Sequence, residues 1–147
     1  MSPAGLAAHA LALLGAGAGP VLVVCPWAPR LAAALAALVP RARDGEVPMG
    51  AVVVFLGAAP GPAKRQAALR AVERRLPPGA PLVLVDHNQP RALWRRALAV
   101  LQLAVRGLPA ARARYPAARE LGALGFAVER LWLGGGERVQ LVRARRR

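Results

Sequence analysis

The segment from Gly50 to Asp86 constrains the fold more than any other part of the chain. It reads GAVVVFLGAAPGPAKRQAALRAVERRLPPGAPLVLVD. Two short valine-rich runs, 51–56 and 82–85, flank a stretch of helical character over about residues 62–76. Continuous apolar runs of this length are typical of parallel strands buried on both faces of a sheet. Because parallel strands need a crossover of about a dozen residues or more, the segment predicts a βαβ unit.

This unit also predicts where a functional site would lie. In open α/β sheets, ligands bind beyond the carboxyl ends of the strands, which places residues 57–61 and 86–88 first. Asp86 stands beside His87, and a carboxylate can orient an imidazole that removes a proton from a hydroxyl or an amine. The alternative is that Asp86 caps the turn and His87 is simply exposed.

Further elements surround the βαβ unit. Leu6, Ala10, Leu13 and Leu14 recur at helical spacing, and a strand over 21–25 follows. Pro29 is suited to begin a helix, whose apolar run covers 31–39. The charged segment 41–50 predicts a loop.

The second half of the chain predicts two helices and a hairpin. A stripe of apolar residues at helical spacing predicts a helix that faces the core: Leu93, Trp94, Ala97, Leu98, Leu101 and Val105. Trp94 and Tyr115 are candidates to shape an acceptor pocket, with core packing as the alternative. A short helix from Pro116 ends at Gly125, and glycines 134–136 join strands 126–133 and 138–142 as an antiparallel hairpin.

Composition and charge limit the partners. The 147 residues, 56% of them hydrophobic, predict a single domain over 1–147 with its own core. The formal charge of +14 indicates nucleic acid as a partner of the arginine-rich surface, while a general bias toward Ala, Arg, Gly and Pro is the competing interpretation. Residues 143–147 hold four arginines and are interpreted as a basic tail. Cys25 is the one cysteine, which excludes an internal disulfide and favours a cytoplasmic protein.

Several chemistries are excluded by residue types. Ser2 is the only serine and threonine is absent, so a Ser or Thr nucleophile paired with histidine is not expected. One cysteine and two histidines do not make a zinc site, and no metal is predicted. A phosphate loop fails at Ala63 and Arg65, where glycine and a hydroxyl residue are needed. Glycines interrupt the uncharged run 4–25, so no membrane span is expected.

Together these features resemble the class I S-adenosylmethionine-dependent methyltransferases of the small-molecule type. The resemblance rests on the turn PPGAP before LVLVD, on YPAARELGALGFAVERLWL and on the closing GGGERVQLVRARR, and it covers about residues 50–147. The segment VLVVCPWAPRLAAALA stands at the place of the family's first strand, loop and helix. The resemblance implies an α/β, Rossmann-like methyltransferase sheet, truncated to about five strands, with a C-terminal antiparallel hairpin.

The resemblance also implies site residues. S-adenosylmethionine would lie against Cys25, Pro26, Trp27 and Gly57, with Glu46 or the nearby Asp44 in place of the family's ribose-binding acid. Asp86 and His87 would be catalytic, and the acceptor would be a small molecule. Two features depart from the family: residues 25–29 contain no glycine, and the short segment 30–53 has no room for the family's second and third strands.

The predicted function is therefore methyl transfer from S-adenosylmethionine. Two alternatives stay open, which are a catalytically inactive methyltransferase-like protein that binds a partner, and a basic RNA-associated protein. The predicted sheet order is the first strand, the strand with Val52, the strand with Val83, the last strand and the penultimate strand. This order leaves the first strand at an edge, where either the N-terminal helix covers it or a second copy pairs with it as a homodimer.

Overall fold

A mixed five-stranded sheet forms the centre of the computed structural model, which describes residues 2–15, 19–56, 61–105 and 116–147. The strand order is β1-β2-β3-β5-β4. Strands β1 to β3 are parallel, β5 is antiparallel to β3, and β4 is antiparallel to β5. This arrangement confirms the predicted fold class, the strand order and the C-terminal hairpin. The strands are β1 (Val21–Val24), β2 (Gly50–Val54), β3 (Pro81–His87), β4 (Ala127–Gly134) and β5 (Val139–Arg145).

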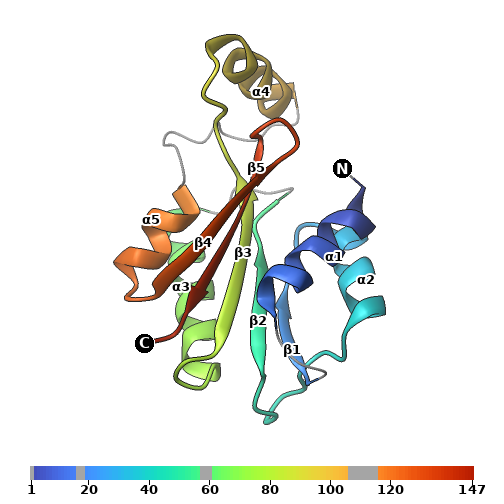
Figure 1. Cartoon of the computed structure of the whole chain (residues 1–147), viewed down its shortest axis with the longest axis vertical. Helices are drawn as coiled ribbons and strands as arrows, with labels where there is room; N and C mark the ends of the chain where they lie inside the picture. The colour runs from blue at the N-terminus through green and yellow to red at the C-terminus, as the bar shows by residue number, and fades with distance from the viewer. Residues whose placement is uncertain (1, 16–18, 57–60, 106–115) are drawn as a thin grey trace.

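Two pairs of helices cover the two faces of the sheet (Figure 1). Helices α1 (Pro3–Leu14) and α2 (Pro29–Leu38) pack on one face, and α3 (Pro62–Arg75) and α5 (Pro116–Ala123) pack on the other. Successive strand residues point to opposite faces, so Val52 joins the α1/α2 core while its neighbour Val53 joins the α3/α5 core. The continuous valine runs are therefore buried on both sides, as the sequence predicted.

Local sequence explains where the helices begin. The Ser2 hydroxyl oxygen accepts a hydrogen bond from the Gly5 backbone N–H at 3.1 Å and caps α1. Proline stands near the start of α1, α2 and α3, where the lack of an N–H costs nothing. At the start of β2, a Cβ on Gly50 would lie 3.0 Å from the Pro81 carbonyl oxygen. Glycine is thus favoured there, because a side chain would crowd the Pro81 carbonyl of β3 and Leu14 of α1.

The outer edge of β1 is covered by the chain itself. The Val21 N–H donates to the Pro40 carbonyl, and the Ala42 N–H donates to the Val21 carbonyl, each at 2.9 Å. The Arg41 guanidinium bonds the Val23 carbonyl at 3.3 Å. The expectation that α1 covers this edge is wrong, because α1 packs on a face of the sheet, and the segment predicted as a plain loop supplies the cover instead.

The predicted basic tail is largely strand. Strand β5 continues to Arg145, which lies opposite Pro81 of β3. The Arg143 side chain pairs with Glu129 at 2.9 Å and donates to the Leu13 carbonyl at 3.0 Å. The Arg146 backbone bonds Gly79 and Ala80. These contacts correct the interpretation of 143–147 as a basic tail, because residues 143–145 belong to β5 and the Arg146 backbone is hydrogen-bonded to the turn before β3.

Helix α4 (Leu93–Val105) forms where a helix was predicted, but its apolar stripe does not face the core. In Figure 1, α4 stands beyond the carboxyl end of β3, away from both helical layers. Ala99 is buried, while Leu93, Leu101 and Val105 are 79%, 59% and 80% exposed. The prediction of a core-facing stripe is therefore wrong, because both faces of the sheet are already occupied by other helices.

Candidate functional site

The carboxyl ends of β1, β2 and β3 meet at one edge of the sheet, as parallel pairing requires. Residues 25–27 follow β1, Phe55 and Leu56 follow β2, and β3 ends with Asp86 and His87. Five of the predicted site residues therefore lie at this edge: Cys25, Pro26, Trp27, Asp86 and His87.

Cys25 is a packing residue at this edge. Its Sγ is 3.4 Å from the Ala28 carbonyl oxygen, to which the thiol donates. Burial raises the pKa of the thiol, and the Ala28 contact and the charge of Arg41 offset that effect only in part. A thiol held in its neutral form is a poor nucleophile, so Cys25 supplies shape rather than reactivity.

An aromatic step joins the ends of β1 and β2. The rings of Trp27 and Phe55 have centroids 5.8 Å apart and are tilted by 40°. Phe55 is fully buried, whereas Trp27 is half-buried. The Arg65 guanidinium lies 4.2 Å from the centre of the Phe55 ring, a cation–π contact from the first turns of α3. Part of the Trp27 ring is thus exposed to solvent at the edge, while the Phe55 ring is buried.

Arg65 is the centre of the charged part of the site. Its Nη2 donates to Asp86 Oδ2 at 2.6 Å and to Glu120 Oε2 at 2.7 Å, so one guanidinium joins α3, β3 and α5. Burial by itself lowers the pKa of Arg65, but the hydrogen bonds and charges of Glu120 and Asp86 outweigh it and raise the pKa. The arginine is therefore held in its charged form by its two acidic partners.

Sequence reasoning missed Arg65 and Glu120. Arg65 entered the sequence analysis only as a residue that breaks a phosphate-loop motif. No spacing rule connects residue 65 with residue 120, because α3 and α5 become neighbours only on the folded sheet. The one available signal was an acid at the carboxyl end of a buried strand, since a buried carboxylate requires a partner.

Asp86 and His87 lie where they were predicted, with a contact that differs from the expected one. Asp86 Oδ1 accepts the backbone N–H of His87 at 2.7 Å, and Oδ2 is held by Arg65. Both carboxylate oxygens of Asp86 are thus engaged, and the residue is 5% exposed. The half-buried His87 completes β3. The catalytic assignment of both residues stays a prediction.

The turn of the β4–β5 hairpin fixes the end of β3. The buried Asn88 amide donates to the Glu137 carbonyl at 2.9 Å, and the Asn88 N–H donates to the Arg138 carbonyl at 2.8 Å. Gln140 is fully buried and donates to the His87 carbonyl at 2.8 Å. These amide contacts hold the backbone on both sides of His87 at the carboxyl edge.

The other predicted site residues that the structure describes do not join this group. Glu46 accepts the Arg43 backbone N–H at 2.9 Å in the loop before β2, and Asp44 pairs with Arg75 at 3.4 Å. That loop lies at the amino end of β2, and five strand residues separate it from the carboxyl edge by about 16 Å. Gly57 and Tyr115 lie outside the described residues. Trp94 projects from α4 and is 63% exposed.

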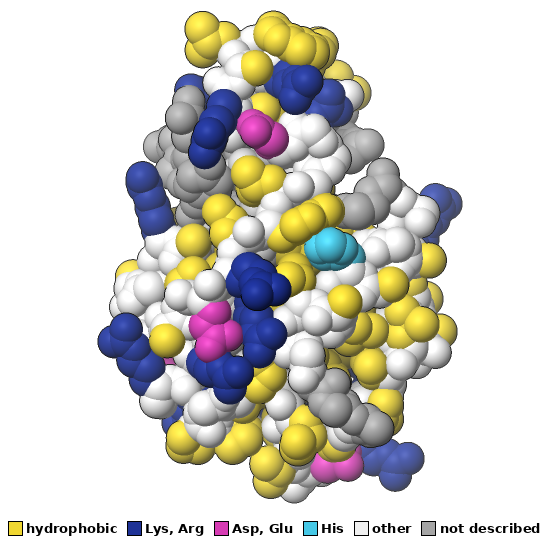
Figure 2. All heavy atoms as spheres, in the orientation of Figure 1, with side chains coloured by type: hydrophobic (Ala, Val, Ile, Leu, Met, Phe, Trp, Pro, Cys, Tyr) yellow, Lys and Arg dark blue, Asp and Glu magenta, His cyan; other side chains and the backbone are white. Residues whose placement is uncertain are grey.

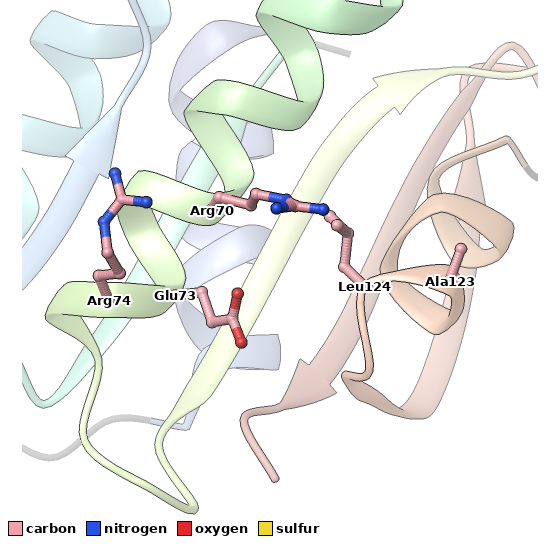
Figure 3. A pocket seen from close by; sticks show the side chains of 5 residues that line it. All are labelled: Arg70, Glu73, Arg74, Ala123 and Leu124. Atoms are coloured by element: carbon pink, nitrogen blue, oxygen red, sulfur yellow. The ribbon is translucent and has the colours of Figure 1, made fainter.

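A separate hollow lies between α3 and the end of α5. It has a volume of about 290 Å³ and is lined by Arg70, Glu73, Arg74, Ala123 and Leu124. Figure 3 shows Arg70 extending from α3 toward Leu124, with Glu73 beneath it. Three lining residues come from the middle and the end of α3, and the other two are the last residue of α5 and the residue after it, so the hollow is distinct from the carboxyl edge formed by residues 25–27 and 86–88. Across the described ranges, no cluster of three acidic, histidine or cysteine side chains is arranged to hold a metal.

Comparison with known proteins gives a fold and no close sequence relative. No protein-family model matches the chain. No curated protein sequence matches it either. Solved structures do match, and their sequence identity to this chain is between 11% and 18% for the three described next.

The pyocyanin biosynthetic protein PhzM superposes with a TM-score of 0.65 at 17% identity, over 97% of this chain and 55% of its own. The mitomycin 7-O-methyltransferase MmcR gives 0.64 at 18% identity, over 97% and 53%. Human N-acetylserotonin methyltransferase, solved in complex with SAM, gives 0.60 at 11% identity, over 95% and 51%. The chain thus spans about half the length of these neighbours.

The protein therefore has a class I methyltransferase-like fold. This conclusion confirms the fold-level resemblance noted in the sequence, and it concerns the architecture alone. The shared sheet accounts for the coverage of nearly the whole chain at low identity, because buried strands and packed helices tolerate many apolar sequences.

Proposed function

We propose that this domain binds S-adenosylmethionine at the carboxyl edge of β1 to β3 and transfers a methyl group to a small-molecule acceptor. The proposal rests on the class I methyltransferase-like fold. Two of the structures that share this fold are named as methyltransferases. Ligands of open α/β sheets bind beyond the carboxyl strand ends, and the half-buried Trp27 lies there. When bound, the cofactor supplies an electrophilic methyl group on its sulfonium centre.

The residues at this edge support a mode of binding through side chains. Residues 25–29 contain no glycine, and Pro26 and Pro29 have no N–H to donate. The backbone therefore does not offer the close approach that a glycine-rich loop gives. Trp27 instead presents an aromatic face, and stacking of a base on such a face stabilises binding by about 1–3 kcal/mol.

Asp86 and His87 take different parts in this proposal. Arg65 and the His87 N–H hold both oxygens of Asp86, so Asp86 positions the end of β3 rather than accepting a proton. His87 carries an imidazole at the carboxyl edge, and it accepts the proton that an acceptor hydroxyl or amine loses. The buried Gln140 keeps the His87 backbone in place.

Calorimetric titration with S-adenosylmethionine and with S-adenosylhomocysteine tests the binding step. We expect saturable binding, and a thermal shift equivalent to about 2.7 kcal/mol at a ligand concentration of about 100 times the dissociation constant. Trp27→Ala should weaken binding by about tenfold or more. Trp94→Ala is the control, because Trp94 is an exposed tryptophan of α4 and is not among residues 25–27, 55–56 and 86–87, which form the proposed cofactor site.

The chemical step is tested by the release of S-adenosylhomocysteine in the presence of a panel of small phenols and amines. We expect His87→Ala to lower turnover by about a hundredfold, the usual contribution of a general base, while cofactor binding persists. Turnover that is unchanged in His87→Ala would remove His87 from the reaction. Absence of cofactor binding by the folded protein would contradict the proposal as a whole.

A second candidate function, which is the alternative of a catalytically inactive partner-binding protein, is compatible with the network around Arg65. The guanidinium ties Asp86 to Glu120, and the Trp27–Phe55 step packs beside it, so side chains of the protein already satisfy one another at this edge. A methyltransferase-like protein that binds a partner without catalysis requires a stable fold at this edge but no bound cofactor. It predicts a well-folded protein whose thermal stability is indifferent to both cofactor forms.

A further inference from the structure

Helix α4 presents its apolar side to solvent. At about 100° per residue, the exposed apolar residues occupy a continuous arc of about 160° around the helix. Trp94 is 63% exposed, and Leu98 and Val100 are also exposed. The space-filling view has hydrophobic side chains gathered at the top of the molecule, over α4 (Figure 2). The arc consists of Leu93, Trp94, Ala97, Leu98, Val100, Leu101, Ala104 and Val105.

The side of α4 that faces the domain is the less apolar one. Gln102 accepts a hydrogen bond from Arg138 of the hairpin turn at 2.7 Å, and Ala99 is buried on the same side. Beneath the helix, the Arg91 N–H donates to the Glu137 carboxylate at 2.8 Å. Contacts of Gln102 and residue 91 thus fix which way the helix is turned, and they direct the apolar arc outward.

Arginines border the outward arc. Arg95 and Arg96 are exposed and lie on its two sides, and the Arg95 guanidinium is 5.1 Å from the centre of the Trp94 ring. Helix α4 contains no acidic residue. An apolar arc with tryptophan and leucine between arginines is the pattern of helices that lie in a membrane interface.

The charge of the whole chain also favours contact with an anionic lipid surface. The formal net charge is +14. Most described carboxylates already have arginine partners, including Asp86 and Glu120 on Arg65, and Glu129 on Arg143. An anionic lipid surface attracts nearby basic residues by about 1 kcal/mol each, over a range set by salt screening.

A second copy of the chain fits this face less well. A helix of 13 residues is about 20 Å long and about 10 Å wide, so two such faces bury on the order of 400 Å². Stable interfaces bury about 1,200–2,000 Å². Pairing would also bring together two molecules of charge +14, with Arg95 and Arg96 of each at the contact.

We propose that α4 docks this protein on an anionic lipid surface. The apolar arc enters the boundary between headgroups and acyl chains, while Arg95 and Arg96 reach lipid phosphates. None of the described helices is long and apolar enough to cross a membrane, and the proposed contact lies along the surface. It places the carboxyl edge of β3, to which α4 is joined, next to the bilayer.

Vesicle flotation of the full chain tests the proposal. Vesicles of phosphatidylcholine alone are compared with vesicles of phosphatidylcholine and phosphatidylglycerol in equal amounts. We expect the protein to float with the anionic vesicles and Leu101→Glu to lower its partition at least about tenfold. Leu38→Glu is the matched control, because Leu38 is a comparably exposed leucine on α2, and it should change binding little.

A second variant and a spectroscopic signal guard against indirect effects. Val105→Gln adds no charge, and its side chain is 80% exposed, so the variant should fold and still bind less tightly. Anionic vesicles should shift the fluorescence of the wild-type protein to shorter wavelength, and this shift should be lost in Trp94→Phe.

Three results would overturn the proposal. Absence of flotation with anionic vesicles is the first. Equal flotation of Leu101→Glu and wild type is the second, because arginines alone would then hold the protein, as they would hold it to RNA. The third is a wild-type dimer in sedimentation that Leu101→Glu converts to a monomer, which would assign the arc to a second copy.

Discussion

Helix α3 is the more charged of two helices and is packed on the sheet, whereas α4 is the more apolar and is exposed. Helix α3 carries six charged residues among 14, yet it packs on the sheet with Leu69 and Val72 buried. Helix α4 carries two charged residues among 13, yet most of its apolar side chains are exposed. The connections explain the difference, because α3 crosses between parallel strands and is forced onto a sheet face.

An apolar stripe in the sequence defines one face of a helix, but it does not determine which part of the protein packs against that face. Helix α4 follows β3 but leads into the part of the chain before α5 rather than directly into a paired strand. Helices α1 and α2 cover one face of the sheet and α3 and α5 cover the other, so neither face is left for α4 to pack on. The stripe then forms an apolar surface patch, which is the surface proposed to dock on lipid.

We expect the largest difference between the two helices when one leucine in each is truncated to alanine. Leu69→Ala on α3 should lower the free energy of unfolding by about 2–5 kcal/mol, because a fully buried leucine leaves a cavity. Leu101→Ala on α4 should change it by less than about 0.5 kcal/mol. Urea unfolding followed by circular dichroism measures both values. Similar losses in the two variants would mean that α4 is packed in solution.

An arginine pair gives the next largest difference. Arg65→Met removes the guanidinium that holds Asp86 and Glu120 and should destabilise the fold by about 1–3 kcal/mol, since Asp86 stays buried without its ion partner. Arg95→Met on α4 should stay within about 0.5 kcal/mol, because Arg95 is exposed. The same unfolding assay applies. An unaffected Arg65→Met would mean that the network adds no stability.

A pair of thiols tests burial through pH. Burial raises the pKa of Cys25, so the stability it contributes is present below the unfolded pKa of about 8.5 and is lost as pH rises through the folded pKa. Stability should therefore fall above about pH 8.5 more in wild type than in Cys25→Ala. Adding Leu101→Cys to Cys25→Ala should not restore that fall, because a thiol on the exposed side of α4 resembles the unfolded one. Thermal unfolding across alkaline pH measures this.

The smallest effect concerns tryptophan accessibility, with no change in stability expected. Trp94 is 63% exposed, while Trp27 and Trp132 are half-buried. Acrylamide should quench wild-type fluorescence more strongly than that of Trp94→Phe. Trp27→Phe is the comparison, and it should leave most of the quenching in place. Equal quenching in both variants would show that α4 is covered in solution.

Much of the fold was predictable because it depends on local patterns. Valine-rich runs of strand length and the prolines that begin helices led to all five strands, their order and the helix positions, within a few residues at the boundaries. The carboxyl edge followed from parallel pairing, which brought Asp86 and His87 to the expected place. The partners of those residues were not predictable, because Arg65 and Glu120 approach Asp86 only after α3 and α5 pack.

The sequence by itself determined an α/β sheet with a C-terminal hairpin, since strand and helix periodicities, turn glycines and helix-starting prolines act over a few residues. Tertiary structure decided what each polar and apolar side chain meets. It placed Arg143 and Arg145 in a strand, pinned the Asp86 carboxylate to Arg65, and left the apolar arc of α4 exposed. The physical reason is that burial and charge pairing depend on which surfaces remain free after the whole chain has packed.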